Sequence, residues 1–223
     1  MTVSCIFRVF KMNRLTKRII ENLPNPVFSV HDLTVLEPSS DNLRPALVKR
    51  AVADGDLIII RRGLYAVAPV YRKVNINAFS VAQLVYGPSY ISLESALSAH
   101  GWIPEGVRDI VSVTSRLSKD FDTSVGHFSY IRIPQQTLYA GVRRITDDAE
   151  RSWMIASPLK ALADYVYFHK VDWTSIDPII KSLRIEEEQL EELVRADFDE
   201  VEGNYKSVRV RRFLQGIKKD VLA

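Results

Sequence analysis

Side chains that could bind phosphates or read base edges gather between residues 39 and 69 of the chain. Arginine and lysine pair with phosphate oxygens, whereas amide and hydroxyl groups can read base edges in the major groove. This mixture in one short stretch predicts a surface that binds double-stranded DNA. We expect the contacts to come from Ser40, Asn42, Arg44, Pro45, Lys49, Arg50, Arg61, Arg62 and Tyr65.

The first half of this stretch is predicted to be a helix, from about Asp41 to Asp54. Ser39 or Ser40 can accept hydrogen bonds from the free amides of the first turn, where a proline is also tolerated. Apolar residues recur at every fourth position, so one face is expected to be buried and the other left for a partner. The predicted inner face comprises Leu43, Ala46, Leu47, Val48 and Ala51, and the outer face Asn42, Pro45, Lys49 and Ala53.

A basic hairpin is predicted directly after this helix. Leu57 to Ile60 and Leu64 to Val67 have strand length and composition, and the turn between them is Arg61-Arg62-Gly63. A helix followed by such a ribbon is typical of a winged helix-turn-helix, in which the helix enters the major groove and the wing contacts the backbone. We therefore expect Asn42 and Lys49 to read base edges and the wing arginines to contact phosphates. The alternative is a solvated basic hairpin on a small α+β domain.

The residues upstream complete a small basic domain. Two shorter helices are predicted, at about 14–23 and 29–36, with a short strand or staple at Val27 and Phe28 between them. Residues 1–73 hold twelve Lys and Arg against six Asp and Glu, a net charge of +6, whereas residues 74–223 hold eighteen against twenty-one, a net charge of −3. A positive surface attracts phosphates and releases their counterions. We place the domain boundary between residues 73 and 74.

Residues 74–223 alternate between helix and strand signals, which predicts a mixed helix and sheet domain with a helical C-terminal tail. The predicted strands lie at about 110–114, 127–133, 138–145 and 152–156. The predicted helices lie at about 78–86, 90–102, 157–170, 176–183, 186–198 and 205–217. Lys160 and Asp164 are spaced as a surface pair on one helix, and no partner is found that would make Asp164 a catalytic acid. The fold class is therefore α+β.

The end of the chain carries two blocks of opposite charge. Residues 185–203 hold nine acids and one arginine, and residues 204–223 hold six bases and one acid. Such blocks are usually solvated faces of helices that pack against each other. The alternative is that one of them meets a charged protein partner.

Several classes of enzyme and cofactor site lack their motifs. The chain has no Gly-x-Gly, no Gly-Lys-Ser/Thr, no His-Glu-x-x-His and no Gly-x-Ser-x-Gly. We therefore predict no catalytic site, no cofactor and no metal, and we expect a protein that is not an enzyme. The lone Cys5 excludes an internal disulfide, and no stretch is long enough to span a membrane. These features favour a cytoplasmic protein that makes no membrane contact.

The chain resembles the AbiEi family, the antitoxins of type IV toxin-antitoxin and phage-defence operons. The resemblance covers roughly residues 14 to 170 and rests on three blocks: GDLIIIRRGLYAVAP from Gly55 to Pro69, YISLESALSAHGWIPEG from Tyr90 to Gly106 with Val113-Thr114-Ser115 after it, and ASPLKALADYVY from Ala156 to Tyr167. Leu159 stands where an acidic residue is expected, which we interpret as a surface change. The tail after about residue 171 matches no pattern of the family.

The resemblance implies a protein with two domains and two activities. The N-terminal winged helix would repress its own operon by binding inverted repeats. The C-terminal domain would oppose a cognate toxin that resembles a nucleotidyltransferase, with or without direct contact. The alternative is a stand-alone transcriptional regulator whose second domain senses a ligand or dimerises.

Overall fold

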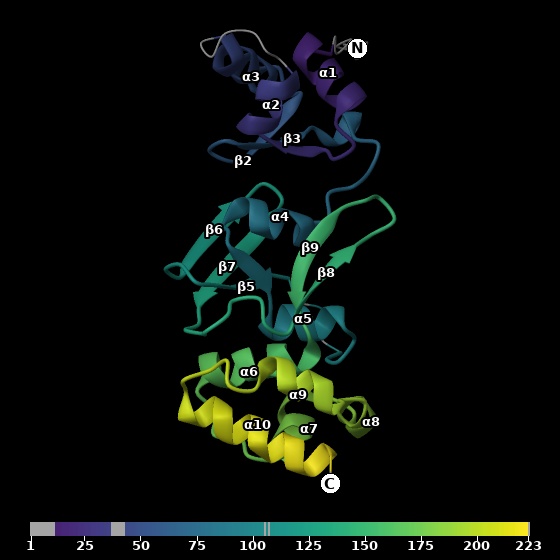
Figure 1. Cartoon of the computed structure of the whole chain (residues 1–223). Coiled ribbons are helices and arrows are strands. Elements are labelled where there is room, and N and C mark those ends of the chain that lie inside the picture. Colours follow the sequence, from purple (N-terminus) through teal and green to yellow (C-terminus); the bar gives the residue numbers. More distant parts are fainter. Residues whose placement is uncertain (1–11, 37–42, 105, 107, 223) are drawn as a thin grey trace, which may run out of the picture. The chain divides into compact units, whose positions relative to one another are not determined.

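The computed structural model describes residues 12–36, 43–104, 106 and 108–222. Within these residues the chain is a mixed α+β protein with ten α-helices, one short 3-10 helix and two β-sheets (Figure 1). It divides into two compact units, Met1–Ile76 and Asn77–Ala223, which we call unit 1 and unit 2. The division after residue 76 lies close to the boundary placed after residue 73 from the sequence.

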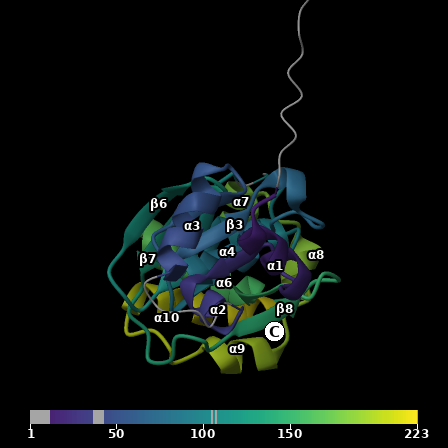
Figure 2. The same ribbon diagram turned by 90° about the horizontal axis from the view of Figure 1, so that it is seen from above.

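Unit 1 has three helices and a small antiparallel sheet. Strand β3 is central in this sheet, with β1 and β2 on its two sides. Helix α3 packs against α1 and β2, and Figure 2 shows α1 and α3 above the strands. The elements in chain order are α1 (Arg14–Asn22), β1 (Val27–Ser29), α2 (Val30–Leu36), α3 (Leu43–Ala53), β2 (Leu57–Arg61), β3 (Leu64–Val67) and the 3-10 helix η1 (Pro69–Tyr71). The predicted order of helices and hairpin is thus confirmed over the described residues.

Local hydrogen bonds fix where the elements of unit 1 begin. The side chain of Asn13 accepts from the backbone N–H of Leu15 at 3.0 Å and so caps α1. The backbone N–H of Asn13 donates to the buried carboxylate of Asp56 at 2.6 Å, which ties the start of α1 to the turn between α3 and β2. At α2, the backbone N–H of Ser29 donates to Asp32 Oδ2 at 2.7 Å, and the backbone N–H of Asp32 donates to Ser29 Oγ at 3.3 Å. This reciprocal pair forms a capping box.

Unit 2 is built on a six-stranded sheet of order β6-β7-β5-β4-β9-β8. The pairs β5–β7 and β4–β9 are parallel, and the other neighbours are antiparallel. The strands are β4 (Ser89–Ile91), β5 (Ile110–Thr114), β6 (Lys119–Thr123), β7 (Gly126–Arg132), β8 (Val142–Thr146) and β9 (Ser152–Ala156). The helices are α4 (Ala78–Val85), α5 (Leu93–Ala99), α6 (Pro158–His169), α7 (Asp177–Leu183), α8 (Glu187–Glu191), α9 (Arg195–Val201) and α10 (Val208–Val221).

Helix α6 is the centre of the packing in unit 2. It contacts α5, α9, α10 and β9, and in Figure 1 it lies between the sheet and the C-terminal helices. The helix begins where predicted, because Ser157 caps it by accepting from the backbone N–H of Lys160 and Pro158 occupies its first turn. Leu159, interpreted from the sequence as a surface position, is fully buried. That interpretation was wrong, because α6 is covered on several sides and not only by the sheet.

Two of the helices predicted for unit 2 differ in the structure. The segment predicted as one helix from Tyr90 begins with strand β4, because it pairs with β5 on one side and β9 on the other and is buried throughout. The segment predicted as one helix over 186–198 is broken at Val194, whose backbone is extended, so α8 and α9 are separate. Pairing inside a sheet thus overrode the helical periodicity at β4.

One strand and the starts of two other elements in unit 2 also differ from prediction. Strand β6 was not predicted, since its sequence KDFDT is polar and it is an edge strand. Strand β8 starts at Val142, later than the predicted residue 138. Helix α10 starts at Val208, after its cap Ser207, and not at Tyr205. Polar edge strands and helix ends carry weak hydrophobic patterns, which explains these errors.

The turn between β8 and β9 is closed by a partly buried ion pair. Asp147 Oδ2 lies 2.6 Å from Arg151 Nη2 and accepts from Arg151 Nε at 2.8 Å, while Asp147 Oδ1 accepts from the backbone N–H of Arg151 at 3.0 Å. These hydrogen bonds lower the pKa of the Asp147 carboxyl from 3.8 to about 2. Since the folded pKa lies below the unfolded one, the pair stabilises the folded state fully above about pH 4, and this contribution is lost as the pH falls through about 2.

Replacement of Arg151 by glutamine is expected to move the pKa of Asp147 back toward its usual value of 3.8, because the guanidinium provides the largest contribution to the shift. An NMR titration of the side-chain carboxyl carbon over a pH range that brackets both of these values measures the midpoint directly. Arg144→Gln is the matched control, since Arg144 lies in the same hairpin but donates to Ser152. Equal midpoints in wild type and Arg151→Gln would contradict the assignment.

Candidate nucleic-acid interface and ligand pockets

The outer face of α3 carries part of the predicted DNA surface. Pro45, Lys49 and Arg50 are exposed there, and Arg44 is half-buried. The inner face packs into the core of unit 1 through Leu47, Val48, Ala51 and Val52. A helix with one face in the core presents the opposite face to a partner, so the structure leaves Lys49 and Arg50 available for contacts from this element.

The apolar face of α3 is shifted from the predicted one. Leu43 is 55% exposed and Ala46 is also exposed, although both were predicted to face the core. The buried positions fall in the later turns of the helix, where it meets α1 and β2, and the first turn extends past these contacts. Two residues of the predicted DNA surface, Ser40 and Asn42, precede α3 and lie outside the described residues.

The tip of the β2–β3 hairpin carries the two predicted wing arginines. Arg61 ends β2, Arg62 lies in the turn, and both are exposed. Gly63 completes the turn with φ of +81°, a conformation that residues with a Cβ rarely adopt. Tyr65 is half-buried and stacks on Phe28 with the ring centroids 6.0 Å apart, so part of its ring belongs to the core. The tip of the hairpin therefore presents Arg61 and Arg62 to solvent, and Ile59 of β2 is also 51% exposed.

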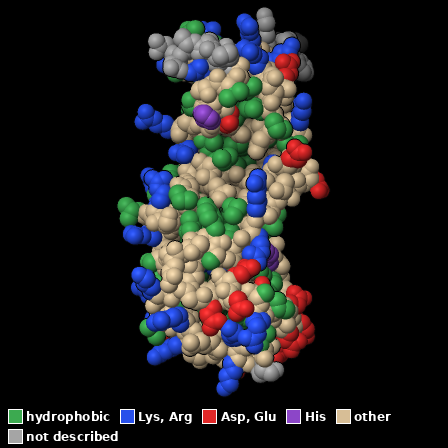
Figure 3. Space-filling model, viewed as in Figure 1, with side chains coloured by type: hydrophobic (Ala, Val, Ile, Leu, Met, Phe, Trp, Pro, Cys, Tyr) green, Lys and Arg blue, Asp and Glu red, His purple; other side chains and the backbone are tan. Residues whose placement is uncertain are grey.

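Basic side chains thus extend over two elements of unit 1. In Figure 1, α3 and the tip of the hairpin lie on the same side of the unit. The structure brings Lys49 and Arg50 of α3 and Arg61 and Arg62 of the hairpin to the surface of one compact unit. In unit 2, by contrast, Figure 3 shows acidic side chains gathered at the lower right, over the region of α8 and α9. The charge difference predicted from the sequence is therefore a difference in exposed charge.

A buried polar cluster lies in unit 2 around Asp164 of α6. Asp164 Oδ2 accepts hydrogen bonds from the hydroxyls of Tyr90 and Ser92, each at 2.7 Å, and Oδ1 accepts from Tyr205 at 2.6 Å. Lys160 Nζ lies 3.5 Å from Asp164 Oδ1 and donates to the Tyr205 hydroxyl at 2.6 Å. Both members of the charged pair are 0% exposed. The predicted surface pair is thus a buried one, and the prediction was wrong because side chains from β4 and from the segments around residues 135 and 205 cover this face of α6.

Gln135 completes the cluster. Its Oε1 accepts from Lys160 Nζ and, at 3.1 Å, from Asn204 Nδ2, while its Nε2 donates to the Tyr90 hydroxyl at 2.7 Å. Burial raises the pKa values of the Tyr90 and Tyr205 hydroxyls well above their usual range, and the charge of Asp164 raises them further. Burial also lowers the pKa of the Lys160 ammonium, although Asp164 acts in the opposite direction. The charges of Lys160 and Asp164 are paired, and the carboxylate and amide oxygen atoms of the cluster accept hydrogen bonds. Through these hydrogen bonds the cluster joins β4, α6 and the segments around residues 135 and 205.

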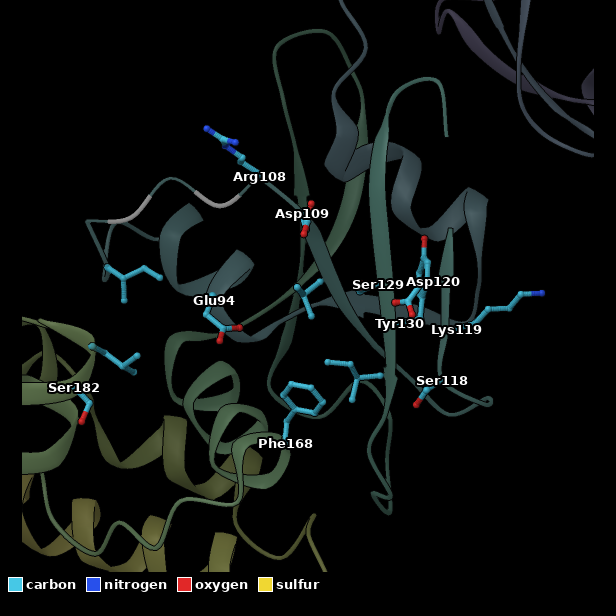
Figure 4. A pocket seen from close by; sticks show the side chains of 14 residues that line it. Glu94, Arg108, Asp109, Ser118, Lys119, Asp120, Ser129, Tyr130, Phe168 and Ser182 are labelled. Atoms are coloured by element: carbon cyan, nitrogen blue, oxygen red, sulfur yellow. The ribbon is translucent and has the colours of Figure 1, made fainter. Parts of the chain in front are cut away.

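A pocket of about 730 Å³ lies in unit 2 beside strands β5 and β7 and helices α5, α6 and α7 (Figure 4). Its apolar lining is formed by Ile103, Val111, Ile131, Phe168 and Leu183, and its polar lining by Glu94, Arg108, Asp109, Ser118, Lys119, Asp120, Ser129, Tyr130 and Ser182. In Figure 4 Phe168 points into the pocket, whereas Lys119 points away from it. Glu94 is paired with His169 at 2.8 Å. The volume suits a small organic ligand, since such pockets usually measure about 300–1,000 Å³.

In the described part of the chain, no group of three or more His, Cys, Asp or Glu side chains is arranged to hold a metal ion. No helix between residues 12 and 222, the gaps excepted, has the length and apolar character needed to cross a bilayer. Comparison of the chain with protein-family models gives no match, and comparison with curated proteins gives none.

The buried cluster was not predicted from the sequence, although one signal for it was present. Lys160 and Asp164 interrupt a helix whose other positions are mostly apolar, and a helix that is apolar on most sides is expected to be covered on most sides. Tyr90, Gln135 and Tyr205 gave no signal, because they are far apart in the sequence and meet only in the folded unit.

Proposed function

We propose that unit 1 is a winged helix-turn-helix that binds double-stranded DNA and that the chain is an antitoxin of the AbiEi type. In this proposal the protein represses its own operon through inverted repeats, and unit 2 opposes a toxin that resembles a nucleotidyltransferase. The supporting observation is the exposure of Lys49 and Arg50 on α3 and of Arg61 and Arg62 at the hairpin tip, within a small unit whose sequence carries an excess of basic residues. Phosphate contacts from such groups supply most of the affinity of non-specific DNA binding.

The order of elements in unit 1 also supports the proposal. A helix that exposes its outer face is followed directly by a two-stranded ribbon with arginines at its tip. In winged helix proteins the helix reads the major groove and the ribbon contacts the backbone. Lys49 would then read base edges or the adjacent phosphates, and Arg61 and Arg62 would contact phosphates.

A fragment that begins at Val74 is expected to fold and to rescue cells from the toxin, because unit 2 has its own sheet and its own helical core. The fragment should fail to repress the operon, since it lacks unit 1. The measurement is growth of cells that express the toxin from an unrelated promoter, with circular dichroism of the purified fragment as the folding control. If the folded fragment failed to rescue while the full chain succeeded, opposition to the toxin would require unit 1, because the unrelated promoter excludes repression as the source of protection.

The pocket of about 730 Å³ favours a second candidate function. A stand-alone regulator whose second unit senses a small ligand would use such a pocket, and its operator affinity would change when the ligand binds. The neighbouring gene distinguishes the two candidates. A downstream nucleotidyltransferase gene supports the antitoxin, and its absence favours the ligand-dependent regulator.

A further inference from the structure

A second pocket of unit 2 has a lining of unusual polarity. It measures about 340 Å³ and lies at the carboxyl ends of the parallel strands β5 and β7. Its polar lining is Ser115, Arg132, Gln135, Gln136 and Lys206. Among these side chains there is no carboxylate, although the sequence of unit 2 has more acidic than basic residues. We call this the anion pocket.

The anion pocket is rich in hydrogen-bond donors. The guanidinium of Arg132 and the ammonium of Lys206 can only donate, and the hydroxyl and amide groups can donate as well. Within the described part of the chain, neither Arg132 nor Lys206 forms an ion pair, and both are exposed. Two cations and several donors around one cavity, without a carboxylate to neutralise them, favour an anion with several acceptor oxygens.

The buried cluster fixes one polar residue of the lining of the anion pocket, Gln135. Gln135 lines the pocket, and its side chain is held from behind by Lys160, Asn204 and Tyr90. The backbone of Gln135 pairs with Tyr205 in an antiparallel bridge, and the N–H of Gln136 donates to the carbonyl oxygen of Asn204 at 3.0 Å. This bridge places Lys206, the next residue, beside the end of β7 that carries Arg132. The amide of Gln135 is therefore positioned before any ligand binds, which reduces the cost of ordering this part of the lining.

The remaining lining limits the size and shape of the ligand. Ile133, Pro134 and Leu138 add apolar surface to the pocket. Its volume is near the lower end of the range of about 300–1,000 Å³ that is usual for small-molecule sites. The pocket therefore suits a compact ligand with one anionic group and one flat or apolar part.

We propose that the anion pocket binds a phosphate ester of mononucleotide size, with Arg132 and Lys206 on the phosphate and the apolar wall against the organic part. Bidentate pairing of an arginine with phosphate oxygens is a strong and directional contact. The same chemistry is offered by a free phosphate ester and by the terminal phosphate of a nucleic acid. This site is in unit 2 and is independent of the proposed DNA surface in unit 1.

The test is isothermal titration calorimetry of the full chain with AMP, with adenosine and with a 5′-phosphorylated single-stranded oligonucleotide. Wild type is expected to bind AMP more tightly than adenosine, since adenosine lacks the phosphate. Arg132→Gln and Lys206→Gln should each weaken AMP binding about tenfold or more, which corresponds to about 1.4 kcal/mol, because each removes a charge-assisted hydrogen bond to the phosphate. Both side chains are exposed, so the melting temperature should stay unchanged.

The matched controls are Lys181→Gln and Lys219→Gln, which remove exposed charges of unit 2 outside the pocket lining. They should bind AMP like wild type, and so should the variant Arg61→Ala with Arg62→Ala, which separates this site from DNA binding by unit 1. Tighter binding of the oligonucleotide than of AMP, lost in Arg132→Gln, would identify nucleic acid as the source of the phosphate. Equal affinities for AMP and adenosine, no AMP binding at millimolar concentration, or equal binding by the Arg132 variant would overturn the proposal.

Discussion

Replacement of Asp164 by alanine is expected to destabilise unit 2 by about 3–5 kcal/mol, because it leaves the buried ammonium of Lys160 without its charged partner. It also removes the acceptor of the Tyr90, Ser92 and Tyr205 hydroxyls. For a unit of this size, each 1 kcal/mol corresponds to roughly 2–4 °C in melting temperature, so the shift should be roughly 6–20 °C. A thermal melt of the full chain, followed by circular dichroism, measures it.

Two further variants separate the buried charge from other effects. Arg143→Gln breaks the exposed ion pair in which Arg143 Nη2 lies 2.7 Å from Glu200 Oε1. This change should lower the free energy of unfolding by at most about 1 kcal/mol. Asp164→Asn keeps an acceptor but removes the negative charge, so the pKa of Lys160 should fall further. Because that folded pKa then lies below the unfolded one, the loss of stability should be largest near neutral pH and should shrink as the pH rises toward the unfolded pKa of lysine, about 10.4. A shift in Asp164→Ala no larger than that in Arg143→Gln would show that the cluster is not needed for stability.

The sequence predicted the local elements of unit 1 well, because local signals are strong there. The capping box of Ser29 and Asp32 and the glycine turn at Gly63 act within a few residues. The orientation of α3 was predicted less well. The face that contains Leu43 is apolar in sequence, but whether a position is covered depends on how far α1 and β2 extend along the helix.

In unit 2 the sequence predicted β5, β9 and α6 and missed the contacts that join them. Strand β4 is three residues long and is set by its neighbours in the sheet, so its own sequence carries little information. The Lys160 pair was assigned to the surface because spacing alone does not show what covers a helix face. This face is internal because Tyr90, Gln135 and Tyr205, which are distant in the sequence, contact it in the folded unit.

The charge blocks at the end of the chain were interpreted as solvated helix faces that pack against each other, and the structure confirms part of this. Lys218 of α10 forms ion pairs with Glu202 and with Asp199 of α9, which join the two blocks. The acidic residues of α8, by contrast, are exposed, including Glu187, Glu188 and Glu191. A charged protein partner therefore remains a hypothesis for α8 and is not needed to explain α9.

The second large effect is expected for DNA binding by unit 1. Replacing both Arg61 and Arg62 by alanine should lower the slope of log affinity against log salt concentration by roughly 1.8, since each neutralised phosphate contributes about 0.9. If the two variants bind alike at 1 M salt, this slope corresponds to a loss of roughly 60-fold in affinity at 0.1 M salt. Titrations of an operator duplex at several salt concentrations measure both quantities.

The alternative for these arginines is that they contribute nothing to DNA binding. Both are exposed, so their removal should change the free energy of unfolding by no more than about 0.5 kcal/mol, and a melt of the variant checks this. Lys181→Ala with Lys219→Ala removes the same charge from exposed positions in unit 2 and should leave the slope unchanged. An unchanged slope in the folded wing variant would contradict the phosphate contacts.

Loss of rescue by the wing variant, with the toxin expressed from an unrelated promoter, would show that the hairpin also acts against the toxin. A lowered slope with normal rescue would assign the hairpin to DNA alone and leave toxin antagonism to unit 2.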